Sequence, residues 1–209
     1  MASEAAWGDQ AQNREEQREQ KRLAVLREAA RQFTERGYDR TSLDEIAGAL
    51  GVSKRTLYYY VKNKEDILSS CSDLAFEKLV APSQEVTAKR ASPPLDRLRV
   101  FMRSYLTMIS TDFGACMLAA RSFPLSDEAR DAVMSGIRGT DKIVRDLIRE
   151  GVEDGSIAPC DPAIVAAVIF GAFNWTTQWR PRDDESWAEK AADRLLDPII
   201  DGLRPRASA

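Results

Sequence analysis

Histidine is absent from this 209-residue sequence. Its absence excludes nucleophiles activated by an imidazole, general acid–base catalysis by histidine, and every metal site that needs a histidine ligand. Long hydrophobic runs are absent as well, because the longest, Ala163–Phe173, has eleven residues and a membrane span needs about 20. Acidic Glu4 and Asp9 are not typical of a secretory signal. We therefore expect a cytoplasmic protein.

Cysteine is scarce and scattered. Cys71, Cys116 and Cys160 lie more than forty residues apart, a spacing that fits neither a disulfide framework nor a zinc site. We expect all three to be small apolar packing residues. The sequence indicates no metal and no cofactor.

Positive charge is concentrated in one short stretch, although the whole chain is slightly acidic. The 30 basic and 33 acidic residues give a net charge of −3. Residues 1–20 carry two basic and five acidic groups. Residues 21–64 carry ten basic and five acidic groups, so residues 65–209 have a net charge of −5. The segment Gly51–Lys64 holds four cations and no acid. A compact basic face on an acidic protein indicates an anionic partner for that face alone.

Apolar residues recur at three- and four-residue steps along most of the chain, which is the pattern of helices with one buried face. The first such helix is expected from Lys21 to Gly37, after a flexible polar tail at residues 1–20. No convincing alternating strand pair occurs, so the pattern predicts an all-α fold. We divide the chain into the tail, a small helical domain at residues 21–66 and a larger one at 67–209.

Capping residues mark where the later helices should begin. Thr41, with Asp44 three residues on, is expected to start the second helix, and Ser53 the third after the break at Gly51. The remaining expected starts are Asn63, Pro93-Pro94, Ser126, Asp161-Pro162 and Ser186.

Two short helices joined by a tight turn, the second rich in cations and tyrosines, predict a helix-turn-helix. An α-helix fills the major groove of DNA, and its first residues face base edges. Lys54 and Arg55 follow the Ser53 cap directly, and arginine can bind guanine through two hydrogen bonds. Lys64 begins the next helix, where backbone N–H groups favour a phosphate. The alternative is a charged, solvated surface helix, but turn, cap, tyrosines and cations together favour DNA.

These residues resemble the DNA-binding domain of the TetR (tetracycline-repressor) family. The resemblance covers about Leu23–Leu68 and rests on the segments Thr41–Ala47, Leu50–Ser53 and Thr56–Glu65. It implies a homodimeric repressor that binds a pseudo-palindromic operator and is released by a small ligand. By the same resemblance, the bases would be faced by Lys54, Arg55, Thr56 and Tyr58, and the phosphates held by Ser42, Tyr59, Tyr60 and Lys64. Asp44 departs from members that carry a cation there, which leaves the operator sequence open.

The segment 161–179 combines small residues with large apolar ones, a composition that lets helices approach closely. We expect it to pair with Leu195–Leu203 in a four-helix dimer interface. The proposed interface residues are Ala167, Phe170, Gly171, Leu195 and Ile199. The alternative is an intramolecular core helix.

A ligand pocket is expected between this bundle and the helices at 94–110 and 126–154. Its proposed apolar lining is Phe101, Tyr105, Met108, Phe113, Met117, Phe123 and Trp175, and its proposed polar groups are Arg121, Asn174, Gln178 and Arg180. Taken singly, each apolar residue could be plain core. The stretch Gly171–Pro181 resembles TetR-like regulators of fatty-acid, sterol and aromatic-acid breakdown, whose ligands are acyl-CoA thioesters.

Two other functions remain open from the sequence. The same DNA-binding domain could serve a transcriptional activator, which sequence does not distinguish from a repressor. An enzyme could use the paired acids Asp127/Glu128 or Asp183/Asp184, but such pairs before a helix are usually caps or solvated. We expect a regulator, not an enzyme.

Overall fold

The computed structural model describes residues 2–88, 91–181 and 186–203, and within these ranges it contains helices and no strand. The all-α prediction is confirmed. The α-helices are α1 (Ala2–Glu35), α2 (Leu43–Ala49), α3 (Lys54–Tyr60), α4 (Lys64–Ala88), α5 (Pro94–Ile109), α6 (Asp112–Ala119), α7 (Asp127–Glu153), α8 (Pro162–Trp175) and α9 (Trp187–Leu203). Two short 3₁₀ helices, η1 (Ala120–Ser122) and η2 (Thr176–Gln178), follow α6 and α8.

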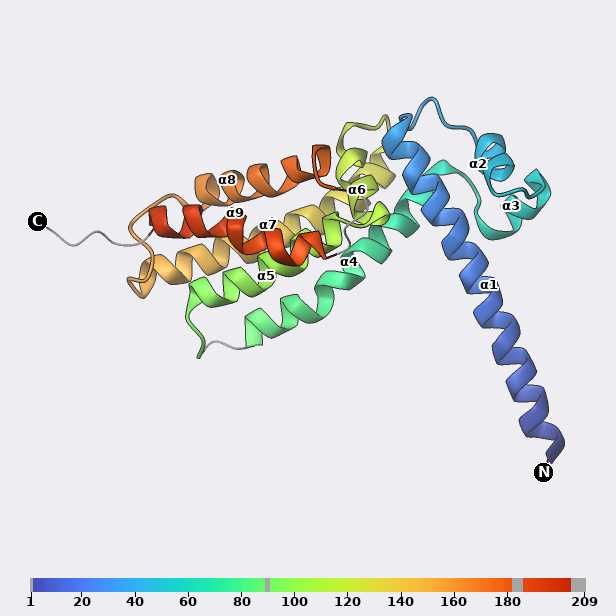
Figure 1. Cartoon of the computed structure of the whole chain (residues 1–209), viewed down its shortest axis with the longest axis horizontal. Helices are drawn as coiled ribbons and strands as arrows, with labels where there is room; N and C mark the ends of the chain where they lie inside the picture. The colour runs from blue at the N-terminus through green and yellow to red at the C-terminus, as the bar shows by residue number, and fades with distance from the viewer. Residues whose placement is uncertain (1, 89–90, 182–185, 204–209) are drawn as a thin grey trace, which may run out of the picture.

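The helices form two groups that share α4. Figure 1 shows α2 and α3 beside α1 at one end of the molecule, and a bundle of α5 to α9 at the other. Helix α4 runs from the small group into the bundle, where it packs against α5, α6 and α7. Helices α8 and α9 lie on the outer side of the bundle, against α7 and α5 respectively. None of the described helices combines the length and the apolar character that a membrane span requires.

Helix α1 is longer than the sequence pattern predicted, because the structure describes residues 2–20 as helix and not as a tail before it. Salt bridges one turn apart support this segment, with Glu15 contacting Arg18 at 3.6 Å and Glu19 contacting Arg22 at 3.4 Å. The spacing of apolar residues predicted only the part of α1 that is packed against other helices. That part ends near Gly37, whose φ of 98° is the left-handed conformation that glycine adopts most easily.

Helix α2 begins one residue later than expected. Ser42, not Thr41, is its N-cap, and Glu45 closes the capping box by accepting from the Ser42 N–H at 2.7 Å. Thr41 is buried and its hydroxyl donates to the Gly37 carbonyl at 3.0 Å. Caps at Ser53, Ser126 and Asp161 are confirmed.

Helix α6 was not predicted, because its eight residues are too few to show a clear period. Thr111 caps it, and it packs against α1, α4 and α5. Gly114 permits the close approach to α5, since a Cβ at this position would lie 2.1 Å from the Met108 carbonyl oxygen. This helix brings the bundle into contact with α1.

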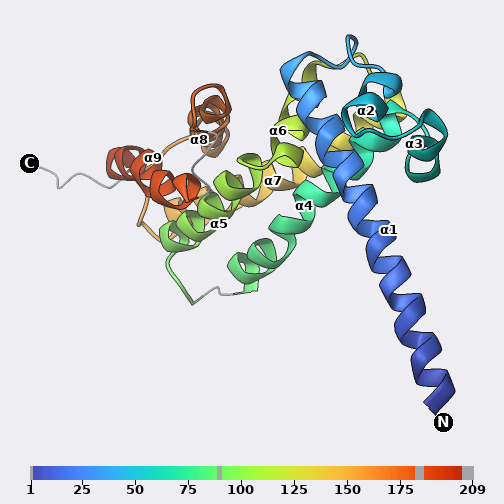
Figure 2. The same ribbon diagram turned by 45° about the vertical axis from the view of Figure 1, so that its right-hand side comes forward.

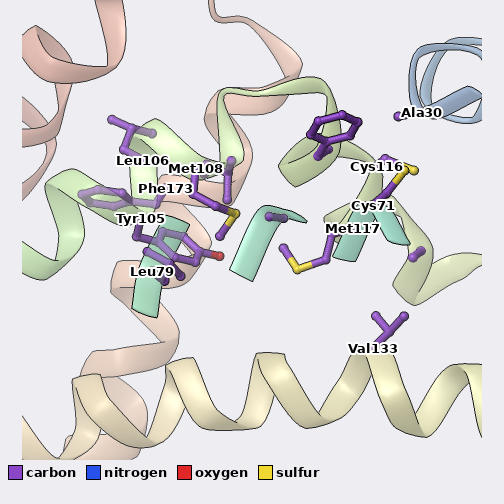
Figure 3. Packing of buried hydrophobic residues seen from close by; sticks show 14 of the residues in the cluster. Ala30, Cys71, Leu79, Tyr105, Leu106, Met108, Cys116, Met117, Val133 and Phe173 are labelled. Atoms are coloured by element: carbon purple, nitrogen blue, oxygen red, sulfur yellow. The ribbon is translucent and has the colours of Figure 1, made fainter. Parts of the chain in front are cut away.

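The core of the bundle is dense and mainly aliphatic. Figure 3 shows Tyr105, Leu106, Met108 and Phe173 gathered beside Leu79 of α4. Arg97 of α5 ties the far end of α4 into this core, because its buried guanidinium donates to the Val86 carbonyl at 2.6 Å and pairs with the partly exposed Glu150 carboxylate of α7. A buried guanidinium needs such partners.

Candidate DNA-binding surface and ligand groove

Helices α2 and α3 form the expected helix-turn-helix. Ile46 and Ala47 of α2 and Leu57 of α3 are buried against α1, and Gly51 in the turn has a φ of 66°. Ser53 accepts from the Thr56 N–H at 3.1 Å and so caps α3. Because Leu57 anchors one side of α3, the other side faces solvent.

The outward side of α3 carries most of the residues that the resemblance assigned to DNA. Lys54, Arg55, Thr56, Tyr58 and Tyr59 are all exposed. The two tyrosines are 48% and 64% exposed, although they are large partly apolar side chains. A short helix that presents two cations and two tyrosines to solvent offers charge, hydrogen bonds and aromatic surface to a duplex.

Asp44 of α2 pairs with the first cation of α3. Its carboxylate accepts from Lys54 Nζ at 2.9 Å, and this hydrogen bond raises the pKa of Lys54. The sequence left open whether Asp44 caps its own helix, and the structure shows it bridging to the next one. Ser42 lies nearby, exposed, with its hydroxyl contacting Glu45 at 2.9 Å.

Lys64 and Tyr60 do not lie on the exposed side of α3 with the other predicted DNA-binding residues. The Lys64 ammonium donates to the Tyr38 carbonyl and lies 4.2 Å from the centroid of the Tyr38 ring. Tyr60 is half-buried and packs edge-on against Tyr59 at 5.1 Å. In this structure the Lys64 ammonium is therefore turned toward α1 and the loop after it, away from the exposed side of α3.

A large open groove separates the inner part of α1 from the bundle. Its volume is about 1080 Å³, and its walls come from α1, α4, the end of α5, α6, η1, the end of α8, η2 and the start of α9. Five of the proposed ligand residues line it: Phe113, Arg121, Asn174, Gln178 and Arg180. Three cations that the sequence did not single out join them, Arg27 and Arg31 of α1 and Lys78 of α4. Two carboxylates, Glu35 and Asp112, are also present.

The other proposed ligand residues lie outside the groove. Phe101, Met108 and Met117 are buried in the bundle core, which is the alternative that the sequence left open. Trp175 is 67% exposed on α8. The groove is thus more polar than the aromatic chamber that the sequence predicted.

Tyr105 connects the core to the edge of the groove. Its hydroxyl donates to Asn174 at 2.7 Å, and burial raises the pKa of this phenol. The phenol is therefore a neutral donor near pH 7, and it fixes the amide of a groove residue.

The segment between α6 and α7 joins the two helical groups. Phe123 stacks on Tyr38 with ring centroids 4.9 Å apart and meets Phe33 edge-on at 6.4 Å. Glu65, in the first turn of α4, accepts from the Ser126 N–H at 2.8 Å and contacts its hydroxyl at 3.0 Å. Arg121 precedes both contacts and lines the groove. The groove and the helical group that contains α2 and α3 therefore meet in this segment.

Helix α8 carries an apolar stripe that no described residue covers. Ile164, Val168 and Trp175 are 63%, 55% and 67% exposed, and they lie on one helix face with Ala167 and Gly171. Phe170 is half-buried beside Tyr105, with ring centroids 5.1 Å apart, and Leu195 and Ile199 of α9 are half-buried.

Comparison with known proteins identifies the family. A model described as "Tetracyclin repressor-like, C-terminal domain" matches residues 91–203, and one described as "Bacterial regulatory proteins, tetR family" matches residues 25–71. The chain belongs to the TetR family. TetR-family proteins are DNA-binding transcriptional regulators and not enzymes. Asp127 and Glu128 lie in the first turn of α7, and Asp183 and Asp184 lie outside the described residues.

Relatives of this TetR-family protein cover nearly its whole length. The TetR-family regulator PfmR from Thermus thermophilus is 33% identical, with a TM-score of 0.74, over 87% of this chain and 99% of that one. The fatty acid metabolism regulator protein of Bacillus subtilis (strain 168) is 23% identical over 190 residues, 90% of this chain and 97% of the relative. AibR, solved with isovaleryl coenzyme A and operator DNA, shares the fold at 24% identity and a TM-score of 0.71, over 89% and 99% of the chains.

Proposed function

We propose that this TetR-family regulator is a homodimeric repressor, which binds a pseudo-palindromic operator through α3 and is released by an acyl-CoA thioester bound in the groove. The observation that carries the DNA part is the exposed side of α3, where two cations and two tyrosines follow a capped N-terminus. In such a position Arg55 can donate two hydrogen bonds to a guanine in the major groove.

The apolar stripe on α8 supports the dimer. Three large apolar side chains in one exposed row are unusual for a surface that stays in water. A second copy would cover them, and Ala167 and Gly171 in the same stripe leave room for a facing helix. A two-fold pair can place its two α3 helices in successive turns of the major groove, where one copy alone would bind weakly.

The charge of the groove supports a ligand with phosphate groups. Five cations and two carboxylates are among its lining residues, and arginine pairs well with phosphate. A volume of about 1080 Å³ suits a ligand larger than a free fatty acid. Phe113, Leu23 and Leu118 add apolar surface for an acyl chain. Relatives named for fatty acid metabolism and for isovaleryl coenzyme A point to the same ligand class.

The position of the groove supports release by the ligand. Arg27 and Arg31 belong to the DNA-binding domain, whereas Arg121 and Arg180 belong to the bundle. A ligand that binds both groups fixes their relative placement. It acts on DNA binding only as far as it binds one arrangement better than the other.

Binding to the DNA upstream of its own gene, measured at several salt concentrations, tests the DNA part. We expect log K to fall with log[salt] with a slope of about −0.9 for each phosphate contact. Arg55→Ala should cost about 1–3 kcal/mol and relax one base preference, whereas an equal loss on every operator variant would reassign Arg55 to a phosphate. A flat salt dependence would contradict DNA binding itself.

A panel of acyl-CoAs of increasing chain length, added to the preformed complex, tests the ligand part. Free fatty acids and free CoA are the matched controls, and Arg121→Ala should raise the acyl-CoA concentration needed for release. If none of the panel releases DNA, the ligand class is wrong and the DNA part stands. A reporter assay then separates the repressor from an activator, since loss of the protein should raise transcription of a repressed gene.

A further inference from the structure

The N-terminal part of α1 extends well past the rest of the DNA-binding domain and contacts α3. Figures 1 and 2 show this part of the helix projecting freely beyond α2 and α3. Where it passes α3, the Arg18 guanidinium carbon lies 5.4 Å from the centroid of the Tyr59 ring. This distance is within the range of a cation–π contact. Tyr59 is the most exposed aromatic side chain of α3, so the contact lies on the surface that we assign to DNA.

Charges on this part of α1 are sorted by face. At 100° per residue, Arg14, Arg18 and Lys21 fall within about 60° of one another. Glu15, Glu16 and Glu19 fall on the remaining sides of the helix, although the Glu15 carboxylate reaches Arg18 at 3.6 Å. The contact with Tyr59 identifies the cationic face as the one on the α3 side. Although residues 1–20 are acidic in net charge, Arg14, Arg18 and Lys21 therefore form a basic stripe on α1 that continues the basic surface of α3.

The direction of the extension fits DNA outside the half-site. In both Figure 1 and Figure 2 the N-terminal end of α1 points away from α8. If two copies pair through α8, as in the proposed function, their α1 extensions point outward from the two-fold axis. They then run along the duplex beyond the base pairs that each α3 reads.

We propose that Arg14 and Arg18 bind phosphates of the DNA that flanks each half-site, with Tyr59 holding the Arg18 guanidinium in place. This inference rests on the proposed function, because it needs α3 in the major groove and a dimer through α8. It adds a sequence-independent contact, which lengthens the operator that the protein occupies.

The test compares two duplexes and four proteins. One duplex ends at the outer edges of the operator, and the other continues for about one helical turn on each side. We expect the wild-type protein to bind the longer duplex about tenfold more tightly at moderate salt. The double variant Arg14→Ala/Arg18→Ala should bind both duplexes equally, and its salt slope on the longer one should be smaller by about 0.9 for each phosphate that it no longer binds. The control Arg138→Ala/Lys142→Ala, which removes two exposed cations from α7, should behave as wild type.

Two results would overturn the inference. The wild-type protein could bind both duplexes equally, or the double variant could lose the same affinity on both, which would show that Arg18 only steadies α3. Arg14→Lys/Arg18→Lys guards against a folding artefact, because lysine keeps the charge and should keep the preference for the longer duplex. If no protein binds either duplex, the proposed function fails first and this inference fails with it.

Discussion

Replacing Phe123 with alanine is expected to weaken both the fold and the coupling between the two helical groups. Phe123 is half-buried and its ring stacks on Tyr38 at 4.9 Å. Replacing a fully buried phenylalanine with alanine lowers the free energy of unfolding by about 3–5 kcal/mol. Because Phe123 is only half-buried, we expect about half of that loss, or about 2 kcal/mol. Loss of the aromatic pair adds about 0.5–1.5 kcal/mol. We expect a loss of about 2.5–3.5 kcal/mol in the free energy of unfolding, or roughly 5–14 °C in melting temperature for a chain of this size.

Two assays on the same protein separate folding from coupling. Thermal unfolding measures the first, and acyl-CoA titration of a fluorescent operator complex measures the second. Phe76→Ala is the matched control, because Phe76 is also half-buried but packs on Gly136 within the bundle. Both variants should melt earlier, and only Phe123→Ala should need more ligand for release. If Phe123→Ala melts and releases DNA as the wild type does, the ring does not join the two groups.

Four further substitutions test other features of the structure. Gly114→Ala should destabilise the protein by about 1–3 kcal/mol in urea unfolding, because its Cβ would lie 2.1 Å from a main-chain oxygen of α5. Gly139→Ala, with nothing within 4 Å of the new Cβ, should instead stabilise it by up to about 1 kcal/mol, and equal effects of the two would refute the packing argument. Asp44→Asn frees Lys54 and should tighten binding to non-operator DNA more than binding to the operator. Competition between non-operator DNA and the labelled operator measures this difference, and an unchanged result would show that the ion pair does not restrain Lys54. Burial raises the pKa of Tyr38 to about 12 from an ordinary 10. As the pH rises, the unfolded chain therefore loses this proton before the folded chain does, and the stability should fall between pH 10 and 12. Tyr38→Phe should make this fall smaller in thermal melts across that pH range, and an unchanged profile would contradict the argument.

The sequence predicts much of the fold, because helix boundaries depend on local chemistry. Ser53, Ser126 and Asp161 cap the helices that follow them, as their hydrogen-bonding side chains suggested. Helix α6 escaped prediction because its position depends on Gly114 fitting against α5, which is a tertiary contact. The helix at residues 14–20 was not predicted, because an exposed segment that carries charge pairs has no apolar period.

The candidate site is less predictable from sequence than the fold. The cations of α3 could be found, since a cap, a turn and a basic cluster stand together in the chain. Arg27 and Arg31 could not be assigned to a groove, because four-residue spacing on the outer face of a helix looks the same with or without a cleft beside it. Lys64 is a different case, because its place in the family motif implies a phosphate contact but does not reveal that its ammonium donates to the Tyr38 carbonyl in this structure.

The part of helix α4 before Pro82 acts as a lever. Its 18 residues span about 27 Å, from the turn after α3 to Pro82, which removes one backbone hydrogen bond from the helix. Pivoting this segment by about 7° at the Pro82 end displaces its other end by about 3 Å, by simple trigonometry on that length. This is close to the rise of one base pair, so a slight rearrangement deep in the bundle is enough to put α3 out of step with the duplex.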